Sequence, residues 1–230
     1  MLEQILEYER SMFFMLNGSD SPFLDRFMWL YTGKVVWLPL AIFIFVILIC
    51  KKNWRESLFI LLAIALVITL CDQFASHLIK PYFERFRPTH HPGFMEDVKI
   101  VFGYRGGRYG FISSHAANAF GFAMFMSLLF RYRIFTIVVF LWAFFTAYTR
   151  VYLGVHFISD VVPGALVGLL FGWLVYILYI YVRKKFVCDV EEKPPYLLYS
   201  KKQKLGIVFG ILITVLILLI FNVPLTAFLR

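Results

Sequence analysis

Residues 57–71 read SLFILLAIALVITLC, a stretch without a charged side chain that continues, with Asp72 as its single acid, to residue 79. Because a helix needs about 20 apolar residues to cross the hydrocarbon core and bonds its own backbone there, this stretch predicts a transmembrane helix. Five other runs have the same character: residues 35–50, 111–130, 134–149, 161–182 and 205–229. We therefore predict an all-α, polytopic membrane protein, a bundle of six transmembrane helices.

The composition supports a membrane protein. Of the 230 residues, 61% are hydrophobic and 16% are charged, against roughly 45–50% and 25% in soluble domains, which excludes a soluble enzyme and a disordered chain. The net charge of +9 suggests nucleic acid, but the basic residues lie in short clusters between apolar runs, so we expect anionic lipid and no nucleic acid as partner. Cys50, Cys71 and Cys188 form neither an even set nor a CxxC pair, so we expect no disulfide and no metal site.

The distribution of basic residues predicts the orientation. Alternate loops, after the first, third and fifth runs, hold 12 of the 23 basic residues: Lys51, Lys52, Arg55, Arg131, Arg133, Arg183, Lys184, Lys185, Lys193, Lys201, Lys202 and Lys204. The positive-inside rule assigns these loops to the cytoplasm. Both termini and the loop of residues 80–110 then lie outside, and we expect a protein of a bacterial inner membrane with an active site on its extracytoplasmic side.

The first 26 residues predict a separate amphipathic helix on the outer surface of the membrane, before a membrane domain at residues 27–230. An apolar stripe of Leu2, Ile5, Leu6, Met12, Phe13 and Leu16 opposes Glu3, Glu7 and Arg10. Acidic residues stand where a signal peptide would be basic, which argues against a cleavable signal. The alternative is an extension that merely packs on the first span.

Three polar clusters stand at the predicted outer ends of the helices. They are Lys80, Arg85, Arg87 and Pro88 after the second run, Ser113, Ser114 and His115 at the start of the third, and Thr149, Arg150, His156 and Asp160 between the fourth and fifth. Because the third run leads inward and the fourth leads back out, all three clusters reach the same face of the membrane. The topology predicts one site.

The cations of this site indicate an anionic ligand. Lys80, Arg87 and Arg150 are permanent charges at headgroup level, and the fork of an arginine matches phosphate oxygens. The alternative for each cation alone is a side chain that snorkels to the interface. Ser113 and Ser114 are predicted to cap the third helix, whose exposed amide groups also suit an anion.

Two histidines are candidates for catalysis. His156 and Asp160 share a face if they lie on a helix, so the carboxylate can hold a proton on one ring nitrogen and leave the other free to attack. The alternative is a capping Asp160 that touches a packed His156. His115 is either an acid or a structural residue. Asp72, inside the second run, is a further candidate, with a pair to His77 or Arg85 as the alternative.

The spacing of these residues is similar to a known signature. Lys80-x6-Arg87-Pro88, Ser113-x-His115 and Arg150-x5-His156-x3-Asp160, which together span residues 80–160, resemble the three-part motif of the type 2 phosphatidic acid phosphatase superfamily. The resemblance implies metal-independent hydrolysis, without a cofactor, of a phosphomonoester or diphosphate through a phosphohistidine. It implies that His156 is the nucleophile and that Asp160 orients it, while His115 is the acid and then the base.

The same resemblance assigns the binding of phosphate oxygens to Lys80, Arg87, Ser113, Ser114 and Arg150. Three positions depart from the family pattern. Ile112 replaces Pro, Ser114 replaces Gly and Thr149 replaces Ser. Of these, Ser114 matters most, because Gly allows backbone angles and a close phosphate approach that a side chain can obstruct.

We therefore expect a lipid phosphatase that acts on a lipid phosphate in the bilayer. Undecaprenyl diphosphate, phosphatidylglycerophosphate, phosphatidic acid and lipid A are all compatible, with a slight preference for a polyprenyl diphosphate, whose recycling needs an outer phosphatase. A first alternative is a phosphotransferase that passes the phosphate to another lipid. A second is a transporter or channel for anions, against which the absence of repeat halves in the sequence argues.

Overall fold

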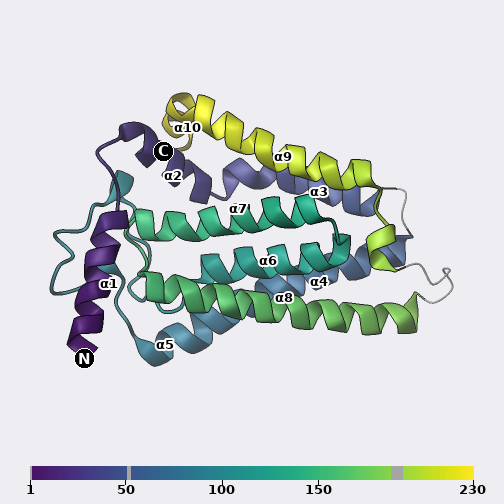
Figure 1. The fold of residues 1–230 in the computed structure, drawn as a ribbon, viewed down its shortest axis with the longest axis horizontal. Helices are drawn as coiled ribbons and strands as arrows, with labels where there is room; N and C mark the ends of the chain where they lie inside the picture. The colour runs from purple at the N-terminus through teal and green to yellow at the C-terminus, as the bar shows by residue number, and fades with distance from the viewer. Residues whose placement is uncertain (1, 51–52, 188–193) are drawn as a thin grey trace.

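The computed structural model describes residues 2–50, 53–187 and 194–230, and all of its regular elements are helical (Figure 1). Lys51, Lys52, Cys188 and Lys193 lie outside these residues. The helices are α1 (Leu2–Leu16), α2 (Pro22–Thr32), α3 (Leu38–Ile49), α4 (Trp54–Gln73), α5 (Lys80–Phe83), α6 (Ser114–Phe130), α7 (Arg133–Tyr152), α8 (Ile158–Phe186), α9 (Lys201–Ile220) and α10 (Asn222–Leu229). Four short helical turns complete them: η1 (Val35–Trp37), η3 (Pro88–His90), η4 (Val101–Gly103) and η5 (Pro195–Leu197).

Four helical segments in the described part of the chain are long and apolar enough to cross a membrane. They are Trp54–Phe83, Arg133–Tyr152, Ile158–Phe186 and Lys201–Ile220. A fifth candidate is the pair of helices Pro22–Thr32 and Val35–Ile49, which meet at an angle of 68°. The third predicted run forms the shorter helix α6, whose 17 residues cover about 25 Å. It begins at Ser114 because residues 111–113 belong to the polar end of the bundle.

Helix α6 lies between α7 and α8 and packs more closely against α8 than against any other helix (Figure 1). Gly164, Gly168 and Gly172 repeat every four residues along α8 and face α6, so the two backbones lie close together. At the start of both helices, the Ser113 N–H donates to the Asp160 carbonyl over 2.9 Å. This close pairing brings the second and third polar clusters of the sequence together.

A π-helical segment, which is wider than an α-helix, connects α4 to α5 without a break in the helix. Residues Phe74–Ile79 form a π-helical segment (η2), and Lys80 follows it directly. Such segments interrupt the regular helical repeat and often occur at functional sites. The long helix therefore changes register just before the first basic residue of the signature.

Helix α1 crosses the end of the bundle at which α5, α10 and the loop of residues 84–113 lie (Figure 1). Phe13 of α1 is fully buried in an aromatic cluster with Phe94 and Phe157, and Met15 on the same helix is exposed. Because Asn17 donates to the Tyr152 carbonyl over 2.9 Å, the end of α1 is also tied to the bundle by hydrogen bonds.

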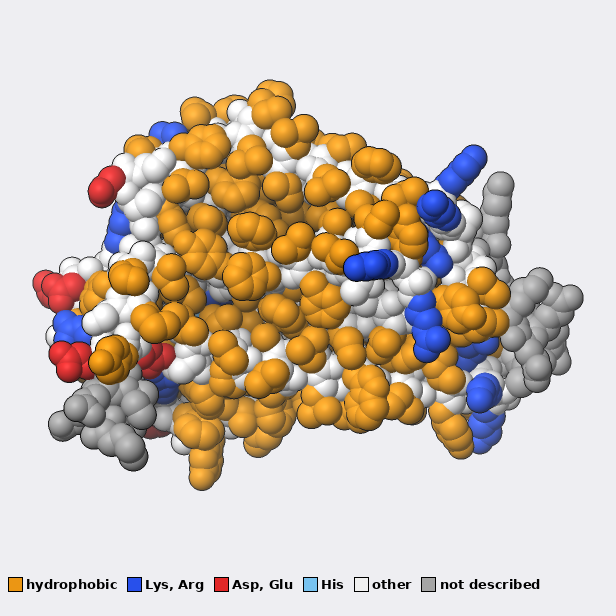
Figure 2. Space-filling view, in the orientation of Figure 1, with side chains coloured by type: hydrophobic (Ala, Val, Ile, Leu, Met, Phe, Trp, Pro, Cys, Tyr) orange, Lys and Arg blue, Asp and Glu red, His pale blue; other side chains and the backbone are white. Residues whose placement is uncertain are grey.

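The outer surface of the bundle is a broad apolar belt with charges at its two ends (Figure 2). Leu166, Leu170 and Phe209 are each at least half exposed, as expected of side chains that face lipid. Two of the basic residues in the predicted cytoplasmic loops have buried partners. Arg183 pairs with Glu56 at 2.8 Å, and Lys204 donates to the Phe130 carbonyl over 2.8 Å.

Candidate active site

The three polar clusters of the sequence meet at the end of the bundle that α1 covers. His156 lies in the turn between α7 and α8, and Asp160 lies in the first turn of α8; both are fully buried. The His156 Nδ1 atom lies 3.3 Å from Asp160 Oδ2. Sequence spacing predicted this contact on a single helix, but His156 precedes the helix, whose N-terminal flanking residue is Phe157.

Asp160 combines the two functions that the sequence left as alternatives. Its Oδ2 atom accepts the Phe157 N–H over 3.0 Å, which caps the start of α8, and also contacts the imidazole. The turn that presents His156 is closed by its own N–H, which donates to the Arg150 carbonyl over 3.2 Å. The backbone and the carboxylate therefore hold the ring in one orientation.

The second ring nitrogen of His156 is buried and has no hydrogen-bond partner among the described residues. Burial lowers the pKa of His156 well below its ordinary value, and the charges of Arg87, Arg150 and Lys80 lower it further. The imidazole is then neutral at pH 7, with the proton on Nδ1 where the carboxylate accepts it. A lone pair on Nε2 is the group that a nucleophile requires.

Arg150, near the end of α7, is the most deeply buried cation of the site, with 1% exposure. Its guanidinium donates to Thr32 Oγ1 over 2.7 Å and to the Tyr104 hydroxyl over 2.8 Å, while its Nε has no partner in the described chain. Burial alone would raise the pKa of Tyr104, but the charge and hydrogen bond of Arg150 lower it below the ordinary value. Two neighbours thus orient a cation that retains a free donor.

Arg87 is held by the loop that follows it. Its Nε donates to the Tyr109 carbonyl over 3.0 Å, and its N–H donates to the Arg108 carbonyl over 3.0 Å. Burial and the charge of Arg150 lower the pKa of Arg87 to about 10, which leaves the guanidinium charged at neutral pH. The glycine-rich stretch of residues 105–110 lies against Arg87, since a Cβ atom at Gly106 would overlap the Arg87 guanidinium.

Lys80 is the first residue of α5, and its side chain reaches both η2 and α6. Its ammonium donates to Ser76 Oγ and to Ser114 Oγ, each over 3.3 Å. Ser114 is the first residue of α6 and has a helical backbone, so the position does not need the conformational freedom of glycine. The hydroxyl at this departure from the family pattern therefore supplies a partner for Lys80.

Ser113 is the N-cap of α6, as predicted, with its Oγ accepting the Ala116 N–H over 3.4 Å. The first amide groups of α6 face the same end of the bundle as the three cations, and a helix N-terminus favours an anion. His115 follows in the first turn of α6. The arrangement provides the positive charge of three cations, the amide donors of α6 and the neutral imidazole of His156 for one anion.

An apolar groove of about 540 Å³ extends from this site along the bundle. Its polar residues include Thr32, Lys34, Asp72, Ser114, His115 and Asn118, and its apolar residues include Trp37, Leu40, Ile64, Ile68, Phe122 and Ile211. His115 thus lies where the cationic site meets the apolar groove. Such a combination suits a molecule with a charged head and an aliphatic tail.

Sequence reasoning missed the groups around the buried pair. Arg85, expected at most as a partner of Asp72, instead pairs with Asp160 at 2.8 Å and with Glu9 at 2.7 Å. Neither Glu9 nor Tyr104 carried a signal in the sequence, because Glu9 lies far before the motifs and Tyr104 lies between two of them without belonging to either. Among residues 2–50, 53–187 and 194–230, no group of three or more His, Cys, Asp or Glu side chains converges as a metal site would require.

The chain is similar to known proteins. A model of the PAP2 superfamily matches residues 56–184 of the chain. A lipid A 4′-phosphatase of Porphyromonas gingivalis is 45% identical over 186 residues, which cover 81% of this chain and 79% of that protein. A lipid A 4′-phosphatase of Bacteroides thetaiotaomicron is 40% identical over 196 residues, 85% of each chain.

Two solved structures are similar in fold. The crystal structure of Aquifex aeolicus LpxE superposes with a TM-score of 0.53 at 30% identity, over 72% of this chain and 92% of that one. A PAP2-type phosphatidylglycerolphosphate phosphatase from Bacillus subtilis superposes with a TM-score of 0.57 at 22% identity, over 82% of this chain and 89% of that one. The second likeness concerns the fold alone.

Proposed function

Because this chain belongs to the PAP2 superfamily, and is a membrane lipid phosphatase, we propose that it removes the 4′-phosphate of lipid A through a phosphohistidine at His156. The observation that carries the proposal is the buried His156, with Nδ1 against Asp160 and Nε2 without a partner, beside three cations. The relatives favour lipid A over the polyprenyl diphosphate that the sequence alone suggested.

The first step forms a covalent intermediate. The lone pair of His156 Nε2 attacks phosphorus, the bond from phosphorus to the lipid oxygen breaks, and His115 gives its proton to that oxygen. Asp160 accepts the hydrogen bond of Nδ1–H and stabilises the positive charge that develops on the ring. The lipid alcohol then leaves along the groove.

The second step regenerates the enzyme. A water molecule gives a proton to His115 and attacks the phosphohistidine, the nitrogen–phosphorus bond breaks, and its electron pair returns to Nε2. Lys80, Arg87, Arg150 and the hydroxyl and amide groups of Ser113 and Ser114 bind the phosphoryl oxygens in both steps. No metal or cofactor is needed, because these cations carry the charge stabilisation.

The groove supports a lipid substrate. It joins His115 and Ser114 to apolar side chains of α3, α4, α6 and α9, so a phosphate at the site can belong to a molecule whose chain extends into the bundle. Removing a CH₂ group from water contributes about 0.8 kcal/mol, so even a partly bound acyl chain adds substantially to affinity.

The remaining elements complete the topology. We count α2 with α3 as one bent span and α6 as a short one, which gives six crossings with α4, α7, α8 and α9. The membrane domain then includes all of α2, from Pro22 onward, and α1 lies on its outer surface. With the basic loops in the cytoplasm, the active site is on the extracytoplasmic side of a bacterial inner membrane.

The test is phosphate release by the detergent-purified protein in EDTA from lipid A, undecaprenyl diphosphate, phosphatidylglycerophosphate and phosphatidic acid. We expect release from lipid A, no release by His156→Ala, and unchanged release by the control His77→Ala, whose side chain is exposed on η2. Activity retained by His156→Ala would refute the phosphohistidine.

The same assay in ¹⁸O-labelled water distinguishes hydrolysis from phosphotransfer. One labelled oxygen in each released phosphate is the result expected of hydrolysis. A newly phosphorylated lipid without labelled phosphate would instead identify a phosphotransferase.

A further inference from the structure

The N-terminal helix reaches the candidate active site, although it lies outside the matched residues 56–184. Glu9, on α1, places one carboxylate oxygen 2.7 Å from Arg85 Nη2. Its other oxygen accepts the Ser159 N–H, at the start of α8, over 3.1 Å. A single side chain of α1 thus contacts both the basic loop and the helix that carries Asp160.

Arg85 connects Glu9 to the buried pair. Its Nη1 atom lies 2.8 Å from Asp160 Oδ1 and 2.5 Å from Ser159 Oγ, and its guanidinium stacks over Phe157 at 4.6 Å. Asp160 therefore uses Oδ1 for Arg85 and Oδ2 for His156. The four side chains form a chain of contacts from the Glu9 carboxylate through the Arg85 guanidinium and the Asp160 carboxylate to the neutral imidazole of His156.

Helix α1 is fixed well enough to hold such a contact. Phe13 packs against Phe157 at a centroid distance of 5.4 Å, directly beside the guanidinium. Asn17 donates to two backbone carbonyls and accepts the Lys99 N–H over 2.8 Å. The position of Glu9 is therefore set by the packing of the whole helix.

We propose that Arg85 and Glu9 are positioning residues: Arg85 holds the Asp160 carboxylate against His156, and Glu9 holds Arg85. The proposal rests on the proposed function, because it assigns to α1 a role in orienting the nucleophile. Without Arg85 the carboxylate is free to rotate away from Nδ1, and without Glu9 the guanidinium has one fixed partner fewer.

The positive charge of Arg85 and the negative charge of Glu9 both act on the buried pair of His156 and Asp160. Other charged or titratable groups face the pair from every neighbouring element: Lys80 from α5, Arg87 from the loop, His115 from α6 and Arg150 from α7. They are unchanged when Arg85 or Glu9 is replaced. The two replacements alone therefore shift the charge at the pair, and in opposite directions.

The experiment compares Arg85→Gln and Glu9→Gln with matched controls on the same segments. Glu7→Gln and Arg105→Gln remove exposed charges whose side chains form no hydrogen bond or ion pair within the described part of the chain. Phosphate release from lipid A micelles gives kcat, KM and the pH profile, while size-exclusion chromatography and thermal unfolding monitor the fold. Arg85→Lys tests whether the positive charge is sufficient.

We expect Arg85→Gln to lower kcat by about 10-fold or more, with KM changed less than about 2-fold, because the phosphate-binding cations remain. The acid limb of kcat/KM should move to higher pH in Arg85→Gln by about 1 unit, and to lower pH in Glu9→Gln. Arg85→Lys should restore the limb. A purely structural role would shift the acid limb of neither Arg85→Gln nor Glu9→Gln. Acid limbs that match those of the control variants in both proteins would therefore overturn the proposal.

A second measurement does not need turnover. In protein labelled with ¹⁵N-histidine, the His156 signals, assigned with His156→Ala, report the position of the ring proton. We expect Nδ1–H in the wild type and a mixture of tautomers in Arg85→Gln. If no lipid is hydrolysed, the proposed function fails, but this spectrum still tests whether Arg85 positions Asp160 against His156. An unchanged His156 tautomer in Arg85→Gln would refute that positioning role.

Discussion

The buried Nε2 atom of His156 lowers the free energy of unfolding of the protein. A buried polar atom without a partner costs roughly 1–3 kcal/mol, and the surrounding cations oppose protonation of the ring. Stability is therefore full above pH 6.5, the ordinary value for histidine, and decreases as the pH falls towards the lowered pKa of His156. Such a loss of stability is typical of a side chain that is retained for its reactivity.

Gly110 shows how closely the backbone approaches this group. A Cβ atom there would lie 3.0 Å from Asp160 Oδ2, 3.2 Å from Arg87 Cγ and 3.5 Å from His156 Nδ1. We expect Gly110→Ala to displace Asp160 and to lower kcat by roughly 10-fold, the effect of about 1.4 kcal/mol on the barrier. Steady-state phosphate release measures it.

Gly107→Ala is the matched control, because a Cβ atom at Gly107 would meet nothing within 4 Å. It should have the kcat of the wild type. Equal losses in the two variants would mean that flexibility of the loop, and not contact with the buried pair, limits the rate.

At the level of elements, the contact of α6 with α8 sets the geometry of the site. A Cβ atom at Gly164 would come within 2.6 Å of the Ser113 carbonyl oxygen, and one at Gly172 within 2.5 Å of the Gly121 carbonyl oxygen. Because α6 carries His115 and the start of α8 carries Asp160, the spacing of these helices also sets the distance between His115 and the carboxylate that contacts His156.

Gly168→Ala tests this coupling. Its Cβ atom would overlap the Ala117 carbonyl oxygen, so α6 and α8 must separate. Overpacking costs about 1–3 kcal/mol, and we expect both a lower unfolding temperature and a lower kcat in detergent.

The control for Gly168→Ala is Gly206→Ala on α9. Its Cβ atom would make an ordinary contact of 3.6 Å with Phe43. Since Ala also favours a helix over Gly, this variant should be as stable as the wild type or slightly more so. A Gly168→Ala protein as stable and as active as Gly206→Ala would show that the helices are not limited by this contact.

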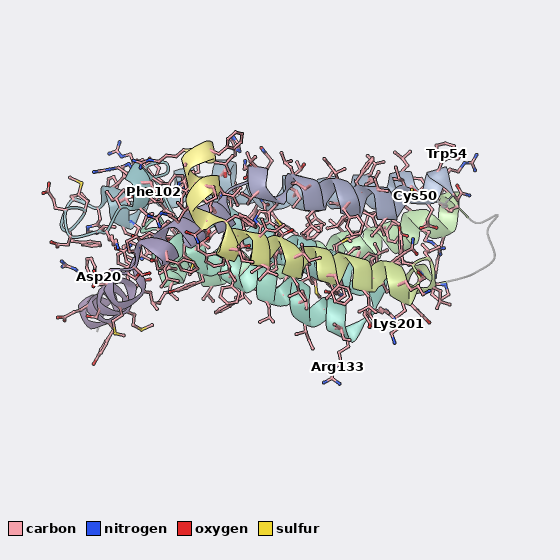
Figure 3. The ribbon with its side chains drawn as sticks, turned by 90° about the horizontal axis from the view of Figure 1, so that it is seen from above. Asp20, Cys50, Trp54, Phe102, Arg133 and Lys201 are labelled. Atoms are coloured by element: carbon pink, nitrogen blue, oxygen red, sulfur yellow. The ribbon has the colours of Figure 1, made fainter. Side chains whose placement is uncertain are left out.

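At the scale of the whole molecule, the site and a concentration of basic residues lie at opposite ends. Asp20 and Phe102 lie at one end, and Cys50, Trp54, Arg133 and Lys201 lie at the other (Figure 3). The apolar belt separates these ends, so the orientation in the bilayer decides which compartment the site faces.

Thiol labelling in intact spheroplasts measures this orientation. One variant combines Asp20→Cys with replacement of Cys50, Cys71 and Cys188 by Ser, and a second retains Cys50, which is exposed, as its single cysteine. A membrane-impermeant maleimide should label the first in intact spheroplasts and the second only after permeabilisation. The reverse pattern would place the site in the cytoplasm.

Sequence alone determined the class of the protein and its motif. Lipid as a solvent imposes long uncharged runs, so hydropathy predicted the four helical segments that are long and apolar enough to cross a membrane. It did not predict α2 with its bend, the shortness of α6 or the end of α9 at Ile220, before the separate helix α10. Local spacing also predicted the contact of His156 with Asp160, because four residues separate them. Both inferences depend on neighbours along the chain.

Only the tertiary structure decided what surrounds the buried pair. Arg85 lies 76 positions from Glu9 and 75 positions from Asp160, so no periodicity or motif connects them. The close approach of Gly110, the contact of Tyr104 with Arg150 and the tie between Lys80 and Ser114 likewise join separate segments. These contacts exist because helix packing brings distant backbone together, and local sequence carries no record of which distant groups will meet.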